Sequence, residues 1–173
     1  MPDELLTWVH AYLERDSDIV VPIKKMWNEW QHNHAEPSLV TFTARVLADS
    51  TIETMGEVDH NDGMAWMNAE EKAEYERDME RMGFFSGPRV KLKTRTLTME
   101  HITTMITKHN TRMEEALRQA MASMPDDASV EEEDMLRNAL RLARRLRQNL
   151  REAGLEANDD EDPKGFGNPK KAS

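Results

Sequence analysis

The sequence predicts a mainly α fold that contains one small antiparallel sheet and ends in a pair of long helices. Three observations support this fold class. Apolar residues recur every three or four positions along most of the chain, which is the period of an amphipathic helix. Residues 87–96 instead alternate with a period of two, which is typical of a strand. Hydrophobic residues make up 38% of the chain and charged residues 32%, a balance that favours elongated helices with solvated faces.

Residues 3–15 predict the first helix, because their apolar side chains fall on one helical face. Asp3 and Glu4 stand at its start, where negative charge is favourable. The β-branched run at 19–21 predicts a short strand. Pro22 follows this strand and suits the first position of a second helix, since no backbone N–H is needed there.

A third helix is expected over residues 39–48, after a break that contains a proline and a serine. The apolar period of this segment predicts that Phe42, Val46 and Leu47 face the core. Residues 51–58 then predict a strand.

A charged helix is expected between this strand and the alternating segment. Asn68 and Glu71 have the spacing of a capping box at a helix start. We therefore expect a helical insertion at about 64–83. Residues 89–96 would then return as a strand and pair with 51–58, which completes a small antiparallel β wing around the insertion.

The order of these elements is that of a winged helix-turn-helix domain, which would occupy residues 1–98. The residues that carry a family resemblance are Leu5, Leu6, Val9 and Leu13, then Val21-Pro22-Ile23, then Phe42, and Leu47-Ala48-Asp49 leading into Ile52-Glu53-Thr54-Met55. On these residues, the first third of the chain resembles the HARE-HTH type of winged helix, the family that includes the delta subunit of bacterial RNA polymerase. The resemblance implies a winged-helix fold and a role at the transcription machinery. The expected helical insertion departs from the family, whose wing is a short hairpin.

A C-terminal antiparallel helical hairpin is expected over 99–154, because two long helices with heptad-like apolar stripes are joined by a short turn. Thr98 can cap the first helix, and Ser129 with Glu132 forms a capping-box pair for the second. Leu140 lies off the main stripe, so the apolar surface is wider than one partner helix covers and a homodimer is expected. The residues expected to mediate self-association are Ile102, Ile106, Met113, Leu136, Leu142, Leu146 and Leu150.

The alternating segment places Arg89, Lys91, Lys93 and Arg95 on one face of the expected strand. Such cations suit contacts to the phosphates of nucleic acid. The alternative is a solvated strand edge, on which cations prevent sheet-to-sheet aggregation. The net charge of −10 favours this alternative, because an acidic surface repels phosphate.

The third helix would be the recognition helix of a winged-helix domain. Its start at Ser38 and its outward residues Thr41 and Arg45 are the candidates for contact with bases. Only Arg45 is strongly suited to base edges, so this helix favours protein contact over sequence-specific readout.

No motif in the sequence predicts an enzyme. The sequence has no cysteine, Gly-rich phosphate loop, nucleophile elbow or HExxH motif, and its histidines lack the spacing of metal ligands. We therefore expect no cofactor and no metal site. The sequence also has no apolar run long enough to span a bilayer, and a cytoplasmic location is expected. Residues 155–173 are polar and acidic, which predicts a disordered tail.

Two function classes follow from these patterns. The first is a non-enzymatic winged-helix protein associated with nucleic acid or the transcription machinery, whose partner is duplex nucleic acid or a protein of the transcription complex. The alternative is an interaction adaptor, whose winged helix binds a protein partner and whose hairpin dimerises. The first needs the wing cations and Arg45 to face the same side, and the second needs an exposed apolar seam on the hairpin.

Overall fold

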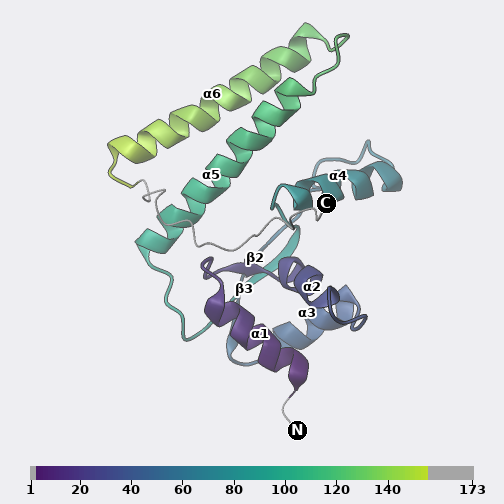
Figure 1. The fold of residues 1–173 in the computed structure, drawn as a ribbon, viewed down its shortest axis with the longest axis vertical. Coiled ribbons are helices and arrows are strands. Elements are labelled where there is room, and N and C mark those ends of the chain that lie inside the picture. The colour runs from purple at the N-terminus through teal and green to yellow at the C-terminus, as the bar shows by residue number, and fades with distance from the viewer. Residues whose placement is uncertain (1–2, 156–173) are drawn as a thin grey trace, which may run out of the picture. The chain divides into compact units, whose positions relative to one another are not determined.

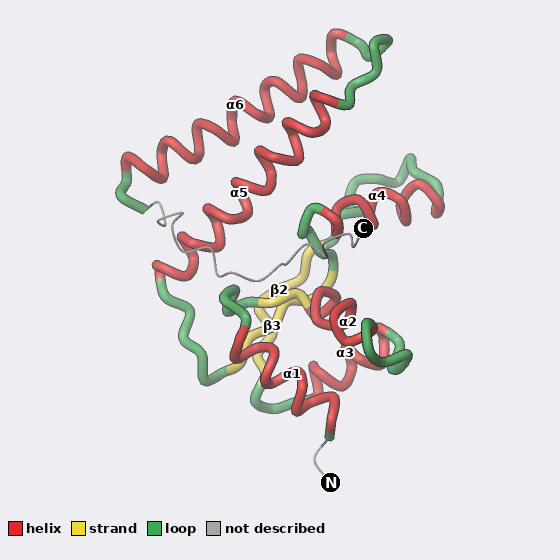
Figure 2. The backbone as a smooth tube through the Cα atoms, in the orientation of Figure 1, coloured by secondary structure: helices red, strands yellow, loops and turns green. Residues whose placement is uncertain are grey.

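The computed structural model describes residues 3–155 and forms two compact units, one reaching to Met105 and the other beginning at Ile106. The described chain is mainly helical, as Figures 1 and 2 show. It also contains a three-stranded antiparallel sheet. The expected acidic tail lies outside the described residues, apart from Leu155. The helices are α1 (Glu4–Arg15), α2 (Ile23–Gln31), α3 (Leu39–Ala48), α4 (Ala69–Arg81), α5 (Met99–Ala122) and α6 (Val130–Glu152), and the strands are β1 (Val21–Pro22), β2 (Ile52–Val58) and β3 (Gly87–Leu92).

Local capping explains where the helices begin. The carboxylate of Asp3 accepts hydrogen bonds from the first backbone N–H groups of α1, and the hydroxyl of Ser38 does the same for α3. The capping box expected at Asn68 is present at the start of α4. The one expected at Ser129 is present at the start of α6. Pro22 is the residue before α2 and not its first helical residue.

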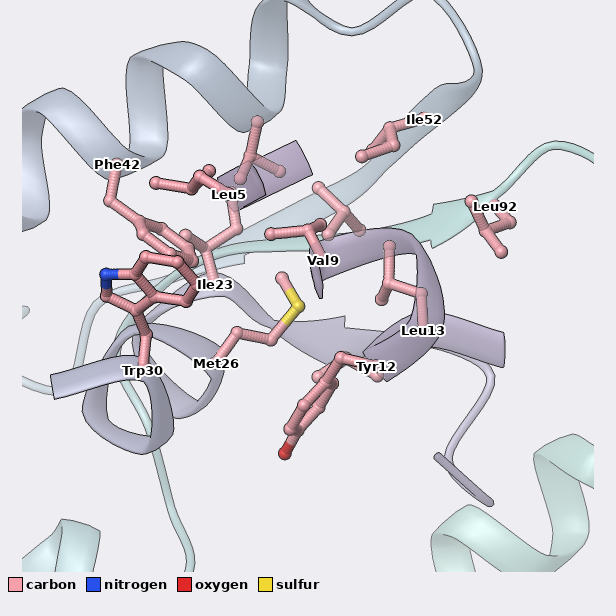
Figure 3. Close-up of a cluster of buried hydrophobic side chains, with 13 residues drawn as sticks. Leu5, Val9, Tyr12, Leu13, Ile23, Met26, Trp30, Phe42, Ile52 and Leu92 are labelled. Carbon is pink, nitrogen blue, oxygen red and sulfur yellow. The ribbon is translucent and has the colours of Figure 1, made fainter. Parts of the chain in front are cut away.

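Helices α1, α2 and α3 pack with the sheet around one apolar core, shown in Figure 3. Two indole groups also fix the turn between α2 and α3. The Trp30 Nε1 donates to the carbonyl of Glu36 at 2.7 Å, and the Trp27 Nε1 donates to the carbonyl of Pro37 at 3.0 Å. The fully buried residues of this core include Val9, Leu13, Val21, Ile23, Met26, Phe42, Val46 and Val90.

The sheet has the order β1-β3-β2, so β3 is its central strand. Val90 of β3 pairs with Val21 on one side and with Thr54 on the other. The expected pairing of the returning strand, β3, with residues 51–58 is therefore confirmed. The interpretation of β3 as a solvated edge strand is wrong, because it has a neighbouring strand on each side. The strand also ends at Leu92 and not at residue 96, because the chain turns there and the N–H of Arg95 donates back to the carbonyl of Leu92 at 3.1 Å.

The helical insertion between β2 and β3 is confirmed as α4. None of its residues is buried, and polar contacts tie it to α2 instead. The ammonium of Lys24 contacts both Glu76, at 2.9 Å, and Glu80. Burial alone would lower the pKa of Lys24, but its hydrogen bonds to Glu80 and Glu76 outweigh burial and raise it. Gly83 follows the helix with a φ of 87°, the left-handed conformation of a helix stop.

Helices α5 and α6 lie side by side and antiparallel (Figure 1). Their contacts join residues 110–114 of α5 to residues 143–147 of α6. The apolar stripe expected to face α6 is not the face that is buried. Ile106 is 42% exposed, whereas the row of Thr103, Thr107, Asn110 and Glu114 is buried.

Candidate interaction surfaces

The cations of the alternating segment are held by contacts within the N-terminal unit. Lys91 is the clearest case, since this charged side chain is only 8% exposed. Its Nζ lies 2.9 Å from the Glu53 carboxylate on the neighbouring strand and 3.0 Å from the carbonyl of Arg95. The hydrogen bond from Lys91 and the positive charge of Lys91 hold the pKa of Glu53 below its usual range.

Arg95 closes the C-terminal end of α1. Its Nη1 donates to the carbonyl of Leu13 at 2.6 Å and to the carbonyl of Asp16 at 2.8 Å. The last carbonyls of a helix have no partner within the helix and carry the negative end of its dipole. The guanidinium of Arg95 therefore stabilises α1 through contacts that span 82 and 79 residues of sequence.

Lys93 and Arg89 complete the set. The Nζ of Lys93 donates to the carbonyl of Ser50 at 2.6 Å, although the residue is otherwise exposed. Arg89 is half-buried and donates to the carbonyl of Phe85 at 3.4 Å. Burial lowers the pKa of its guanidinium. Arg89 and Lys91 lie on β3, whereas Lys93 and Arg95 follow it, so the four cations do not form one free face of a strand.

The polar candidates on α3 are engaged in the same way. The hydroxyl of Ser38 accepts from the Thr41 N–H at 3.3 Å and donates to the Thr41 hydroxyl at 3.1 Å. Arg45 forms an ion pair with Asp3, which joins α3 to the start of α1. The hydrogen bond from Arg45 holds the pKa of Asp3 below its usual range.

The outward face of α3 is instead apolar. Val40 is 80% exposed and Leu47 is 45% exposed, so the expectation that Leu47 faces the core is wrong. Ala44 lies between them on the same face and is exposed as well. Phe42 and Val46 fill the core side of the helix, which leaves no buried position for Leu47. We call Val40, Ala44 and Leu47 the α3 face.

A second group of polar residues meets where α3 ends, and sequence reasoning missed it. Asp49 accepts from His10 Nε2 at 2.8 Å and from the Thr51 hydroxyl at 2.7 Å. Burial alone would raise the pKa of Asp49, but hydrogen bonds from Thr51 and His10 outweigh it and lower that pKa. In a catalytic triad, the histidine contacts the hydroxyl through one ring nitrogen and the carboxylate through the other. Here the Thr51 hydroxyl and the Asp49 carboxylate both contact Nε2 of His10. The group therefore joins α1 to the α3–β2 turn.

Helices α5 and α6 meet across a polar seam. The side chain of Glu114 is 1% exposed and contacts Arg147 at 3.1 Å and Arg118 at 3.2 Å. Asn110 donates to the carbonyl of Ala143 at 3.0 Å and to Glu114 at 3.3 Å. The hydroxyl of Thr107 is buried and has no hydrogen-bond partner among the described residues. The seam therefore contains a buried carboxylate with its ion-pair partners, in addition to the buried apolar side chains of Leu140 and Ala143.

The apolar residues of the hairpin lie largely outside this seam. Leu140 of α6, expected off the main stripe, is buried at 7% exposure. Met135 and Leu142 are each 66% exposed. Of the residues expected to mediate self-association, Leu142, Leu146 and Ile106 are exposed, whereas Ile102, Met113, Leu136 and Leu150 are partly buried.

Residues 3–155 contain no group of three or more histidine, aspartate or glutamate side chains placed to hold a metal ion. None of the helices in that range is long and apolar enough to cross a membrane. No family model, no curated protein and no solved structure matches this chain.

Proposed function

We propose that the N-terminal unit is a non-enzymatic winged helix that binds a protein partner through the α3 face. The order of α1, β1, α2, α3 and β2 supports the winged-helix interpretation, and β2 and β3 supply the wing. In such a domain the third helix is the element that meets the partner.

The exposed apolar surface of α3 is the observation that carries this proposal. Base edges are recognised by hydrogen-bonding side chains, and Val40, Ala44 and Leu47 have none to offer. An apolar protein surface gains free energy when it covers such residues, because their area leaves water. Arg45 is the one charged residue of α3 and is already paired with Asp3. The partner is therefore expected to present an uncharged, apolar surface.

Association with nucleic acid or the transcription machinery, the other expectation from the sequence, remains a prediction. Phosphate binding needs cations that are free to displace counterions. Arg89, Lys91, Lys93 and Arg95 would have to exchange internal contacts for phosphates. Lys93 is the most exposed of the four, so Lys93→Gln tests this role with the least damage to the fold. A mobility shift on mixed duplex DNA that weakens in this variant, with a salt slope reduced by about one, would favour nucleic-acid binding.

Site-specific photo-crosslinking in cells that express the protein tests the α3 face directly. A photoreactive residue at Val40 should form one protein adduct of defined mass, and the same residue at the exposed Glu14 of α1 should not. Adding Leu47→Glu should reduce the Val40 adduct at least tenfold while tryptophan fluorescence remains native. Equal adducts at both positions, or an adduct insensitive to Leu47→Glu, would show that the α3 face is not a binding surface.

A further inference from the structure

The outward face of α6 has a periodic apolar centre. Positions 131, 135, 138, 142 and 145 step by four and three residues, so they share one face of the helix. Met135 and Leu142 stand at its centre, each 66% exposed. A shallow, open depression on this surface is lined by Glu131, Asp134, Met135, Asn138, Ala139 and Leu142. We call positions 131, 135, 138, 142 and 145, with Asp134 and Arg141 at their margin, the α6 face.

The two ends of the α6 face carry opposite charges. Glu131 and Asp134 lie in its first part, and Arg141 and Arg145 lie in its second part. Arg137 of the same helix is instead paired with Glu133. Arg141 and Arg145 have no ion pair among residues 3–155 in the structure. The face therefore has Asn138 in the middle with the apolar Met135 and Leu142 on either side, and it is acidic at one end and basic at the other.

We propose that the α6 face binds the α6 face of a second copy of this chain in antiparallel orientation. Antiparallel pairing about Asn138 places Glu131 of one copy opposite Arg145 of the other. The same register brings Met135 of one copy to within one residue, about 1.5 Å along the axis, of the level of Leu142 of the other copy, twice by symmetry. It also brings the two Asn138 side chains together at the two-fold axis. Asp134 and Arg141 then lie on neighbouring margins, because antiparallel helices bring equivalent flanks together.

Charge selects this orientation over a parallel one. In a parallel pair, Glu131 would meet Glu131 and Arg145 would meet Arg145, and like charges at an interface are destabilising. In an antiparallel pair, each Glu131 instead faces Arg145 of the other copy, and the contact between the apolar side chains is kept. The same reasoning favours a second copy over a foreign partner, since the face is complementary to itself. The inference is independent of the α3 face, which lies on the other unit.

The absence of cysteine from the sequence allows a direct test by disulfide formation in the full chain. A disulfide needs Cα atoms within about 7 Å of each other. In the proposed pair, two copies of residue 138 meet, whereas two copies of residue 131 are about 21 Å apart at 1.5 Å per residue. Asn138→Cys should therefore form a covalent dimer on oxidation with diamide at least tenfold faster than Glu131→Cys. A mixture of Glu131→Cys and Arg145→Cys should form the mixed dimer.

Charge reversal provides a second measurement in solution. The parent chain should sediment as a dimer at tens of micromolar, and Arg145→Glu should shift it at least tenfold toward monomer. Arg144→Glu is the matched control, because Arg144 carries the same charge on a different face of α6, and it should leave the dimer unchanged. Combining Glu131→Arg with Arg145→Glu should restore dimerisation. A monomeric parent would overturn the proposal, and so would a Glu131→Cys chain that dimerises as fast as Asn138→Cys.

Discussion

The buried carboxylate of Glu114 predicts that the hairpin loses more stability when an arginine partner is removed than when Glu114 itself is replaced. Glu114 is 1% exposed at its side chain, whereas its partners Arg147 and Arg118 are 30% and 49% exposed. Loss of Arg147 leaves a buried charge with one fewer partner. Loss of Glu114 leaves two guanidinium groups that can both reach water. Arg147→Met should therefore destabilise the hairpin far more than Glu114→Met.

The magnitudes follow from these contacts. Removing one partner of a buried ion pair costs about 3–5 kcal/mol, and because Arg118 still contacts Glu114, we expect about 3 kcal/mol for Arg147→Met. Replacing the buried charge itself with a well-packed apolar side chain is often neutral, so we expect Glu114→Met to change the free energy of unfolding by less than about 1 kcal/mol. Asn110 keeps its hydrogen bond to the carbonyl of Ala143 in both variants.

Two probes separate the hairpin from the N-terminal unit during urea unfolding. All four tryptophans precede residue 67, so their fluorescence reports the N-terminal unit, and helical circular dichroism reports both units. Arg147→Met should shift the circular dichroism transition to lower urea, Glu114→Met should shift it little, and both variants should leave the fluorescence transition in place. Equal destabilisation by Arg147→Met and Glu114→Met, or a larger effect of Glu114→Met, would refute the desolvation argument.

Three further predictions use the same assays. Thr107→Val should stabilise the hairpin by up to about 1 kcal/mol, because it removes a buried hydroxyl without a partner; a loss of stability in circular dichroism would point to a bound water instead. Arg95→Met should destabilise the N-terminal unit by about 2 kcal/mol through its lost carbonyl contacts, whereas the exposed Lys93→Met should cost less than about 0.5 kcal/mol in the fluorescence transition. The lowered pKa of Asp49 means that its stabilisation is present above its ordinary pKa of 3.8 and is lost as the pH falls through the folded value. Asp49→Asn should therefore flatten the loss of stability below about pH 4 in acid titrations followed by fluorescence, and an unchanged acid profile would contradict the assignment.

The sequence alone determined where most of the helices begin in this chain. Asp3, Ser38, Asn68 and Ser129 each mark a helix start, because a capping side chain bonds to backbone groups only two or three residues away. The alternation that starts at Gly87 likewise predicted a strand, although this strand ends at Leu92 and not at residue 96. Such signals are local, so they are legible without knowledge of the rest of the fold.

Tertiary structure decided how those elements use their side chains. The alternation of the basic segment does not show that β3 lies between two strands, nor that Arg95 reaches carbonyls at the end of α1. The apolar period of α5 does not fix which face meets α6, because that rotation depends on the contacts of both helices. There the carboxylate of Glu114 is buried, its partners Arg118 and Arg147 stay partly exposed, and the apolar Ile106 and Leu142 remain exposed. The candidate binding surface on α3 also depends on tertiary packing. Phe42 and Val46 fill the core side of this helix, and Leu47 is therefore exposed.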